Sequence, residues 1–339
     1  MKMKKVFASV LAGAMVLSLA ACGGSDAASS PAASSALASS PASSAASGET
    51  YTVGICQLVE HVALDAATQG FQDALVAELG DAVEFDLQNA QNDTNTCSTI
   101  INGFVSADVD LILANATPAL QAAAAGTNEI PILGTSITEY GVALDIADFD
   151  GTIGGNISGT SDLAPLEEQA AMLNEWFPDA KNVGLLYCSA EANSQYQVDV
   201  VSAELTAMGY TCTPYAFSDS NDLSAVCTTA AAESDVIYVP TDNTIAANTG
   251  IIDNICRTEK VPVVAGEEGI CSGCGVATLS ISYYDLGYTT GEMAAKILTG
   301  ESDISEMPIE YAPATPKFNE TICTDLGLTA PEGYVAIEQ

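Results

Sequence analysis

Residues 51–80 read YTVGICQLVEHVALDAATQGFQDALVAELG and contain the unit from which the fold follows. The first six residues favour extended backbone, so 51–56 is predicted to be a strand. Apolar residues such as Phe71 then recur at helical spacing until Gly80, which ends a predicted helix over 60–79. A short buried strand that runs into an amphipathic helix is typical of the α/β class.

The same alternation continues along the chain in two successive series. The further strands are predicted at 83–87, 111–114, 130–133, 142–146, 182–187, 211–215, 236–239, 261–264 and 275–281, with an extended run at 309–312. The further helices are predicted at 94–106, 118–125, 163–176, 194–208, 222–233, 244–257 and 284–298. Continuous apolar strands separated by helices indicate parallel sheets that are covered on both faces. We therefore expect two Rossmann-like lobes with a cleft between them.

The N-terminal segment predicts export from the cytoplasm. Three lysines within the first five residues precede an uncharged apolar run over 6–20, which is too short for a comfortable membrane span. These features predict a signal peptide over 1–21. The sequence Leu19-Ala-Ala-Cys22 resembles the bacterial lipoprotein box, which implies that Cys22 carries lipid. The Ser- and Ala-rich residues 22–50 are predicted to be a lipidated linker without a core of its own.

The charge of the chain excludes whole classes of partner. The full sequence has 8 basic and 44 acidic residues, and the predicted signal peptide holds three of the basic ones and none of the acidic ones. The remainder carries a formal charge of −39. Nucleic acid is excluded because no basic patch can be assembled. Anionic lipid would repel the chain, so attachment to a membrane is expected only through the lipid anchor.

The cysteines do not define a disulfide framework. Nine of the ten follow Cys22, an odd number, and most lie in apolar segments, as small buried side chains do. Cys271 and Cys274 form the one CxxC pair, and ordinary loop cysteines are favoured there over a disulfide or a metal or redox site. A zinc site would need a second CxxC or a pair of histidines, and His61 is the sole histidine. Without a nucleophile–base set or a phosphate-binding loop, we expect no enzyme, metal or cofactor.

Ligands of open parallel sheets bind beyond the carboxyl ends of the strands. The residues that follow the predicted strands are mostly polar, and several begin helices, whose free N–H groups bind anions. About half of such side chains are expected to be helix N-caps instead. The candidate ligand-binding residues are Gln57, Glu60, His61, Thr117, Thr135, Ser136, Glu191, Asn193, Ser194, Thr241, Asp242, Asn243 and Glu267.

Several motifs match one family in order and with sensible spacing over about 51–335. They are Val53-Gly-Ile-Cys-Gln-Leu-Val-Glu-His61, Ala116-Thr-Pro118, Ser158-Gly-Thr-Ser-Asp162, Glu191-Ala-Asn-Ser194, Tyr238-Val-Pro-Thr-Asp-Asn243 and Tyr283-Tyr-Asp-Leu-Gly287. The chain thus resembles bacterial ABC-transporter substrate-binding proteins of the tryptophan-binding-protein-like group. It departs from that pattern at Cys56, Val62 and Cys188, where Ser, Pro and Asn are expected.

The resemblance implies a periplasmic-binding-protein type I fold, with three hinge crossings near 154–162, 279–285 and 309–316. Each lobe is then discontinuous in sequence. The expected N-lobe comprises 51–156 plus 283–309, and the expected C-lobe comprises 157–282 plus 310–339.

The resemblance also implies an amino-acid ligand, often an aromatic one. Asp242, with Glu60 or Glu267, is expected to bind the ammonium group. Hydroxyl and backbone N–H groups are expected to bind the carboxylate, because the only arginine, Arg257, is predicted late in a helix. Trp176 is expected in the core, and the tyrosines that are candidates to flank an aromatic ligand are Tyr140, Tyr187, Tyr196, Tyr283 and Tyr284.

The expected protein is a monomeric receptor of an ABC importer, held outside the cell membrane by its lipid. It would deliver a small metabolite to a permease that is powered by a separate ATPase. A nucleoside- or sugar-binding receptor and a ligand-sensing ectodomain of the same fold are the alternatives.

Overall fold

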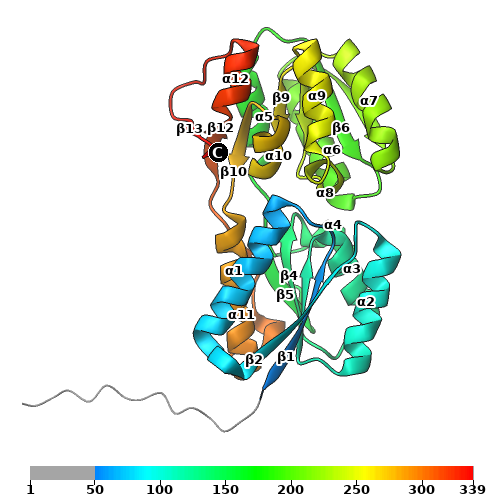
Figure 1. Cartoon of the computed structure of the whole chain (residues 1–339), viewed down its shortest axis with the longest axis vertical. Helices are drawn as coiled ribbons and strands as arrows, with labels where there is room; N and C mark the ends of the chain where they lie inside the picture. The colour runs from blue at the N-terminus through cyan, green and yellow to red at the C-terminus, as the bar shows by residue number, and fades with distance from the viewer. Residues whose placement is uncertain (1–49, 339) are drawn as a thin grey trace, which may run out of the picture. The chain divides into compact units, whose positions relative to one another are not determined.

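The structure of the protein is a computed structural model that describes residues 50–338. The predicted signal peptide, Cys22 and the linker as far as residue 49 lie outside the described residues. The described chain forms two mainly parallel sheets, each covered by its own helices (Figure 1), which confirms the predicted fold class. No helix within 50–338 is both long enough and apolar enough to cross a membrane.

The first lobe contains a six-stranded parallel sheet in the order β11-β5-β4-β3-β1-β2. Its strands are β1 (Tyr51–Gln57), β2 (Val83–Asn89), β3 (Leu111–Asn115), β4 (Ile132–Ile137), β5 (Ile157–Ser161) and β11 (Glu310–Tyr311). Its helices are α1 (Val62–Leu79), α2 (Thr94–Ala107), α3 (Thr117–Gly126), α4 (Tyr140–Ala143) and α11 (Tyr283–Leu298), with short 3-10 turns at Gly80–Ala82 and Ile304–Glu306.

Two cores cover the two faces of this sheet. Along β3, Ile112 packs into a core with α2 and α3, whereas its neighbours Leu111 and Leu113 pack into a core with α1 and α11. This alternation follows from the two-residue period of a strand. The continuous apolar run predicted from the sequence is therefore buried on both sides.

The second lobe contains a seven-stranded sheet in the order β13-β12-β10-β9-β8-β6-β7, in which only the β10–β12 pair is antiparallel. Its strands are β6 (Asn182–Cys188), β7 (Thr211–Phe217), β8 (Val236–Val239), β9 (Val263–Ala265), β10 (Ala277–Ser280), β12 (Thr315–Phe318) and β13 (Val335–Ala336). Its helices are α5 (Leu166–Trp176), α6 (Ala192–Ala207), α7 (Ser220–Glu233), α8 (Asn243–Ala246), α9 (Thr249–Glu259), α10 (Glu268–Cys274) and α12 (Glu320–Leu326).

The chain passes between the two sheets three times, between β5 and α5, between β10 and α11, and between β11 and β12. The first and third crossings come a few residues after the boundaries expected at 156 and 309. The reason is that β5 pairs with β4, and β11 pairs with β5, so that both strands extend the first sheet.

Helices α1 and α11 lie side by side with their backbones in close contact (Figure 1). A Cβ atom on Gly70 would lie 2.1 Å from the carbonyl oxygen of Tyr284, and one on Gly287 would lie 1.9 Å from that of Ala67. Only glycine allows this approach. The packing fixes the first turns of both helices, which border the site described below.

The structure corrects three secondary-structure predictions. Residues 142–146 belong to α4 and the turn after it, and the strand next to β4 is β5, whose polar sequence does not stand out as an apolar run. The helix predicted over 244–257 is divided into α8 and α9. Cys271 and Cys274 lie on α10 rather than in a loop.

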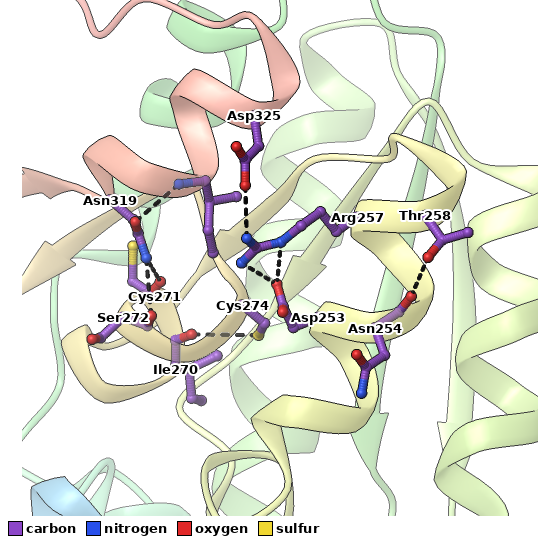
Figure 2. A network of polar contacts seen from close by, with 11 residues as sticks. Asp253, Asn254, Arg257, Thr258, Ile270, Cys271, Ser272, Cys274, Asn319 and Asp325 are labelled. Carbon is purple, nitrogen blue, oxygen red and sulfur yellow. Dashed lines mark hydrogen bonds and ion pairs between the residues drawn. The ribbon is translucent and has the colours of Figure 1, made fainter.

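Figure 2 shows that Arg257 bridges α9 and α12. Its guanidinium lies 2.6 Å from the carboxylate of Asp253 and 2.8 Å from that of Asp325. The arginine therefore holds two helices together and does not bind a ligand carboxylate.

The cysteines act as buried side chains. On α10, the thiol of Cys274 donates to the carbonyl oxygen of Ile270. The nine cysteines between residues 50 and 338 are all free thiols, and all but Cys212 are buried.

Candidate functional site

A narrow cavity of about 10 Å³, room for about one water molecule, lies between the two lobes. The first lobe and the crossings contribute residues from the start of α1, the end of β4, the end of β5 and the start of α11. The second lobe contributes residues from α6 and from the segments after β8 and β9. The lining residues are His61, Leu64, Ser136, Thr138, Asp162, Asn193, Thr241, Asp242, Asn243, Ala246, Glu267 and Tyr283.

The structure brings seven of the thirteen candidate residues to this cavity, and their contact with a ligand stays a prediction. The seven are His61, Ser136, Asn193, Thr241, Asp242, Asn243 and Glu267. The six that do not line it are Gln57, Glu60, Thr117, Thr135, Glu191 and Ser194.

Of these six, Gln57 and Thr135 make hydrogen bonds within the first lobe, and Glu60 is exposed to solvent. The side chain of Gln57 donates to Asp65 Oδ1 at 2.7 Å and accepts from Thr68 Oγ1 at 2.7 Å. The hydroxyl of Thr135 lies 3.3 Å from that of Thr160. Glu60 is exposed at the surface.

Asp242 is a helix cap whose two carboxylate oxygens are already occupied. Its Oδ1 accepts from the backbone N–H of Ile245 at 2.9 Å, at the start of α8. Its Oδ2 accepts from the backbone N–H of Cys188 at 2.7 Å and from the hydroxyl of Ser194 at 2.8 Å. Ser194 therefore supports Asp242 rather than the cavity, and Asp242 is a weaker ammonium ligand than the sequence indicated.

Glu267 is also a cap. Its carboxylate accepts from the backbone N–H groups of Gly269 and Ile270 at the start of α10. The polar residues after the strands thus divide, as the sequence led us to expect, between helix caps and groups that are free to face a ligand.

Asp162 is a lining carboxylate with one oxygen that lacks a hydrogen-bond partner, and it was not among the candidate residues. It follows β5 directly and is 4% exposed. Its Oδ2 accepts from the hydroxyl of Tyr283 at 2.8 Å, whereas its Oδ1 is buried without a hydrogen-bond partner. A buried carboxylate oxygen that faces a cavity without a donor is costly unless a ligand supplies one. Asp162 was missed because β5 was not predicted, and the candidates were chosen as the residues that follow predicted strands.

Two further polar atoms of the lining lack partners. The side-chain amide of Asn193 donates to the carbonyl oxygen of Thr241 at 3.0 Å, which leaves its Oδ1 buried and unpaired. The hydroxyl of Ser136 is also unpaired, and Ser136 has a φ of 56°, an uncommon value for a residue with a side chain. Thr117 has an unpaired hydroxyl as well, at the start of α3 outside the lining.

The electrostatics of the cavity favour a cationic group. Its titratable side chains include three acids and one histidine, and none of the lining residues within 50–338 is a lysine or arginine. Burial raises the pKa of Asp162, raises that of Glu267 to about 7 and, with the charge of Glu191, raises that of Asp242 to about 8. Each buried carboxylate is thus less stable as an anion than it would be in water, and a bound cation would offset that cost.

Of the five candidate tyrosines, Tyr283 lines the cavity and the other four do not. Burial raises the pKa of Tyr283 well above its ordinary value. Tyr140 is buried with its hydroxyl donating to the carbonyl oxygen of Thr160, and Tyr187 packs into the second-lobe core. Trp176 packs against the same core and against Tyr334, as expected.

A groove of about 520 Å³ adjoins the cavity. The two share His61, Ala246, Glu267 and Tyr283. Within residues 50–338, no group of His, Cys, Asp and Glu side chains is arranged to hold a metal ion.

Comparison with known proteins relates the whole described chain to one family. The model of a family described as ABC transporter substrate binding protein matches residues 52–337. The chain is 34% identical over 312 residues to the tyrosine-binding protein of Clostridioides difficile, which covers 91% of this chain and 88% of that protein.

Two solved structures are similar to this one over nearly the same residues. An ABC domain from Streptococcus pneumonia in complex with L-Trp is 30% identical, covers 85% of this chain and all of its own, and has a TM-score of 0.81. A ligand-free, open substrate-binding protein from Clostridium difficile is 36% identical, covers 86% of this chain and all of its own, and has a TM-score of 0.65. The TM-score is thus higher against the L-Trp complex than against the ligand-free, open structure.

Proposed function

The chain belongs to the family of ABC transporter substrate-binding proteins. We propose that it captures an amino acid with an aromatic side chain between its lobes, at the cavity and the groove that adjoins it. The proposal is supported by the similar proteins, one of which is named for tyrosine and one of which holds L-Trp. It is supported equally by the chemistry of the lining.

The observation that carries the proposal is the unpartnered Oδ1 of Asp162. The ligand's ammonium group donates to this oxygen and to the unpaired Oδ1 of Asn193, which belongs to the other lobe. Charge-assisted hydrogen bonds of this kind are about twice as strong as neutral ones. Because the two acceptors come from different lobes, an ammonium group that binds both links the lobes.

Groups that line the cavity and the adjoining groove match the rest of an aromatic amino acid. The hydroxyl of Ser136 donates to the ligand's carboxylate, since no lysine or arginine is at hand. Leu64 and the ring of Tyr283 provide apolar surface for the aromatic side chain. Ligand that contacts both lobes favours the closed form by its differential affinity for that form.

The receptor acts outside the cell membrane as a monomer without catalytic activity. Lipid on Cys22 holds it there, and it delivers its ligand to a permease that is powered by a separate ATPase. A Cys22→Ser substitution tests the anchor: the protein leaves the membrane fraction if the lipid holds it, and stays there if another segment does.

A thermal-shift screen of the purified full chain against amino acids, nucleosides and sugars tests the ligand class. At a hundredfold excess over Kd, a ligand that binds only the folded state raises the free energy of unfolding by about 2.7 kcal/mol. For a chain of this size, that corresponds to a rise in Tm of roughly 5 °C. We expect it with L-tyrosine or L-tryptophan. A rise with only sugars or nucleosides contradicts the proposal.

A further inference from the structure

Among residues 50–338, His61 and Asn92 of the first lobe each form a hydrogen bond with the same short helix of the second lobe. His61 Nε2, at the N-cap of α1, lies 3.2 Å from Asn243 Oδ1. Asn92, in the turn between β2 and α2, donates from Nδ2 to Thr244 Oγ1 at 2.9 Å. Both acceptors are the first two residues of α8 in the second lobe. We call these four residues the latch.

One buried carboxylate holds both second-lobe members of the latch. Glu191 is 3% exposed and does not line the cavity. Its Oε2 accepts from Asn193 Nδ2 at 3.4 Å and from two groups of Asn243, the backbone N–H at 3.0 Å and Nδ2 at 2.7 Å. Its Oε1 accepts from the backbone N–H of Thr244 at 2.9 Å and from that residue's hydroxyl at 2.8 Å.

The four bonds from Asn243 and Thr244 determine which atoms α8 presents to the first lobe. Since the amide nitrogen of Asn243 is committed to Glu191, its carbonyl oxygen faces outward, and His61 Nε2 must be the donor. Since the hydroxyl proton of Thr244 points to Glu191, only a lone pair of that oxygen is left for Asn92. Both α8 side chains thus act as acceptors toward two first-lobe donors.

We propose that Glu191 is a positioning residue for lobe closure: by orienting Asn243 and Thr244 as acceptors, it lets the latch form and so stabilises the closed state. A carboxylate is suited to this task because it accepts all four hydrogen bonds from Asn243 and Thr244 and donates none. The glutamine amide of Glu191→Gln has one acceptor oxygen, so it leaves part of the donor set unpaired or turns the Asn243 amide around. The effect on ligand affinity rests on the proposed function, whereas the effect on closure does not.

The test measures the ratio of closed to open molecules in the ligand-free full chain by single-molecule energy transfer between dyes on the two lobes. Asn92→Gly removes one latch donor and suits the φ of 61° at this position. We expect it to lower the ratio roughly two- to twelvefold, the range that one hydrogen bond supplies. The matched control is Gln91→Gly, at an exposed neighbouring position with a φ of 54°, which leaves the ratio unchanged.

A double-mutant cycle separates positioning from general damage to the second lobe. Glu191→Gln lowers the ratio, and weakens binding of L-tyrosine and L-tryptophan, in the otherwise unchanged chain. It lowers the ratio no further once His61→Ala and Asn92→Gly have removed the latch. An equal fall of the ratio in both backgrounds overturns the proposal. An unchanged ratio in Asn92→Gly also overturns it, and this second test does not require Glu191→Gln to fold.

The ratio of closed to open molecules without ligand also distinguishes failure of the proposed function from failure of the proposed role of Glu191. If neither amino acid binds the unchanged chain, the proposed function fails. The latch is then judged by closure alone: a lowered ratio in Asn92→Gly, with Gln91→Gly unchanged, still supports it.

Discussion

Replacing Asp162 with asparagine separates binding from folding, because the two oxygens of this carboxylate have different partners. The oxygen that accepts from Tyr283 is retained in the amide, so the protein's own hydrogen bond is kept. The other oxygen, which has no partner in the protein, is replaced by an NH₂ group. A ligand ammonium group would then face a donor instead of an anion.

The expected loss follows from the burial of this side chain, which is 4% exposed. A hydrogen bond to a charged group contributes about 1.5–3 kcal/mol, and loss of one partner of a buried charge pair costs about 2–5 kcal/mol. We therefore expect Asp162→Asn to weaken binding by about 2–4 kcal/mol, or roughly 30- to 1000-fold in Kd. Calorimetric titration with L-tyrosine and L-tryptophan measures it.

Stability should move the other way. Burial raises the pKa of Asp162, so the ionised form destabilises the folded chain at a pH above that pKa. Asparagine removes this cost, and the Tm of the ligand-free protein at pH 8 should be unchanged or higher. Binding within threefold of the original refutes the role of Asp162, and a large fall in Tm would show that the carboxylate is structural instead.

The remaining predictions concern protons, packing and thiols. Because burial raises the folded-state pKa of Asp242 to about 8 and of Glu267 to about 7, the folded chain binds protons that the unfolded chain releases above about pH 4. Its free energy of unfolding in urea should therefore fall between pH 5 and pH 8; a rise contradicts this reasoning. Gly287→Ala should destabilise the chain by about 3 kcal/mol or more, since its Cβ would overlap the backbone of α1, whereas the control Gly103→Ala, at an open position in α2, should stabilise it by about 0.5–1 kcal/mol. Native protein should react with a thiol reagent fastest at the half-buried Cys212 of β7 and, after denaturation without reductant, at every cysteine from 50 to 338; unreactive cysteines in the denatured chain would reveal disulfides.

The fold was predictable because its signals are local. The strand and helix periodicities of 51–80 recur through both lobes, and each series builds a sheet in which the strand order reverses in the same way. The rule that ligands bind beyond strand ends also brought residues from both lobes to one cavity. His61 and Asn193 are far apart in sequence, yet both line it.

The chemistry of the site was less predictable because it depends on which hydrogen bonds are already made. Asp242 and Asp162 are both acidic residues near strand ends. The first is saturated by Cys188, Ser194 and Ile245, whereas the second keeps one oxygen free. Because the sequence of β5 is polar, this strand was not predicted, and Asp162 was not recognised as the residue that follows it. No periodicity reports such saturation, because it arises from contacts between distant segments.

The account depends on a single recognition event, the capture of an ammonium group between the lobes. The most direct measurement compares, by calorimetric titration of the full chain, L-tyrosine with 3-(4-hydroxyphenyl)propionate, which keeps the ring and the carboxylate but lacks the amine. We predict that the amine-free compound binds at least 30-fold more weakly, which corresponds to about 2 kcal/mol. Equal affinity for the two compounds would contradict the account.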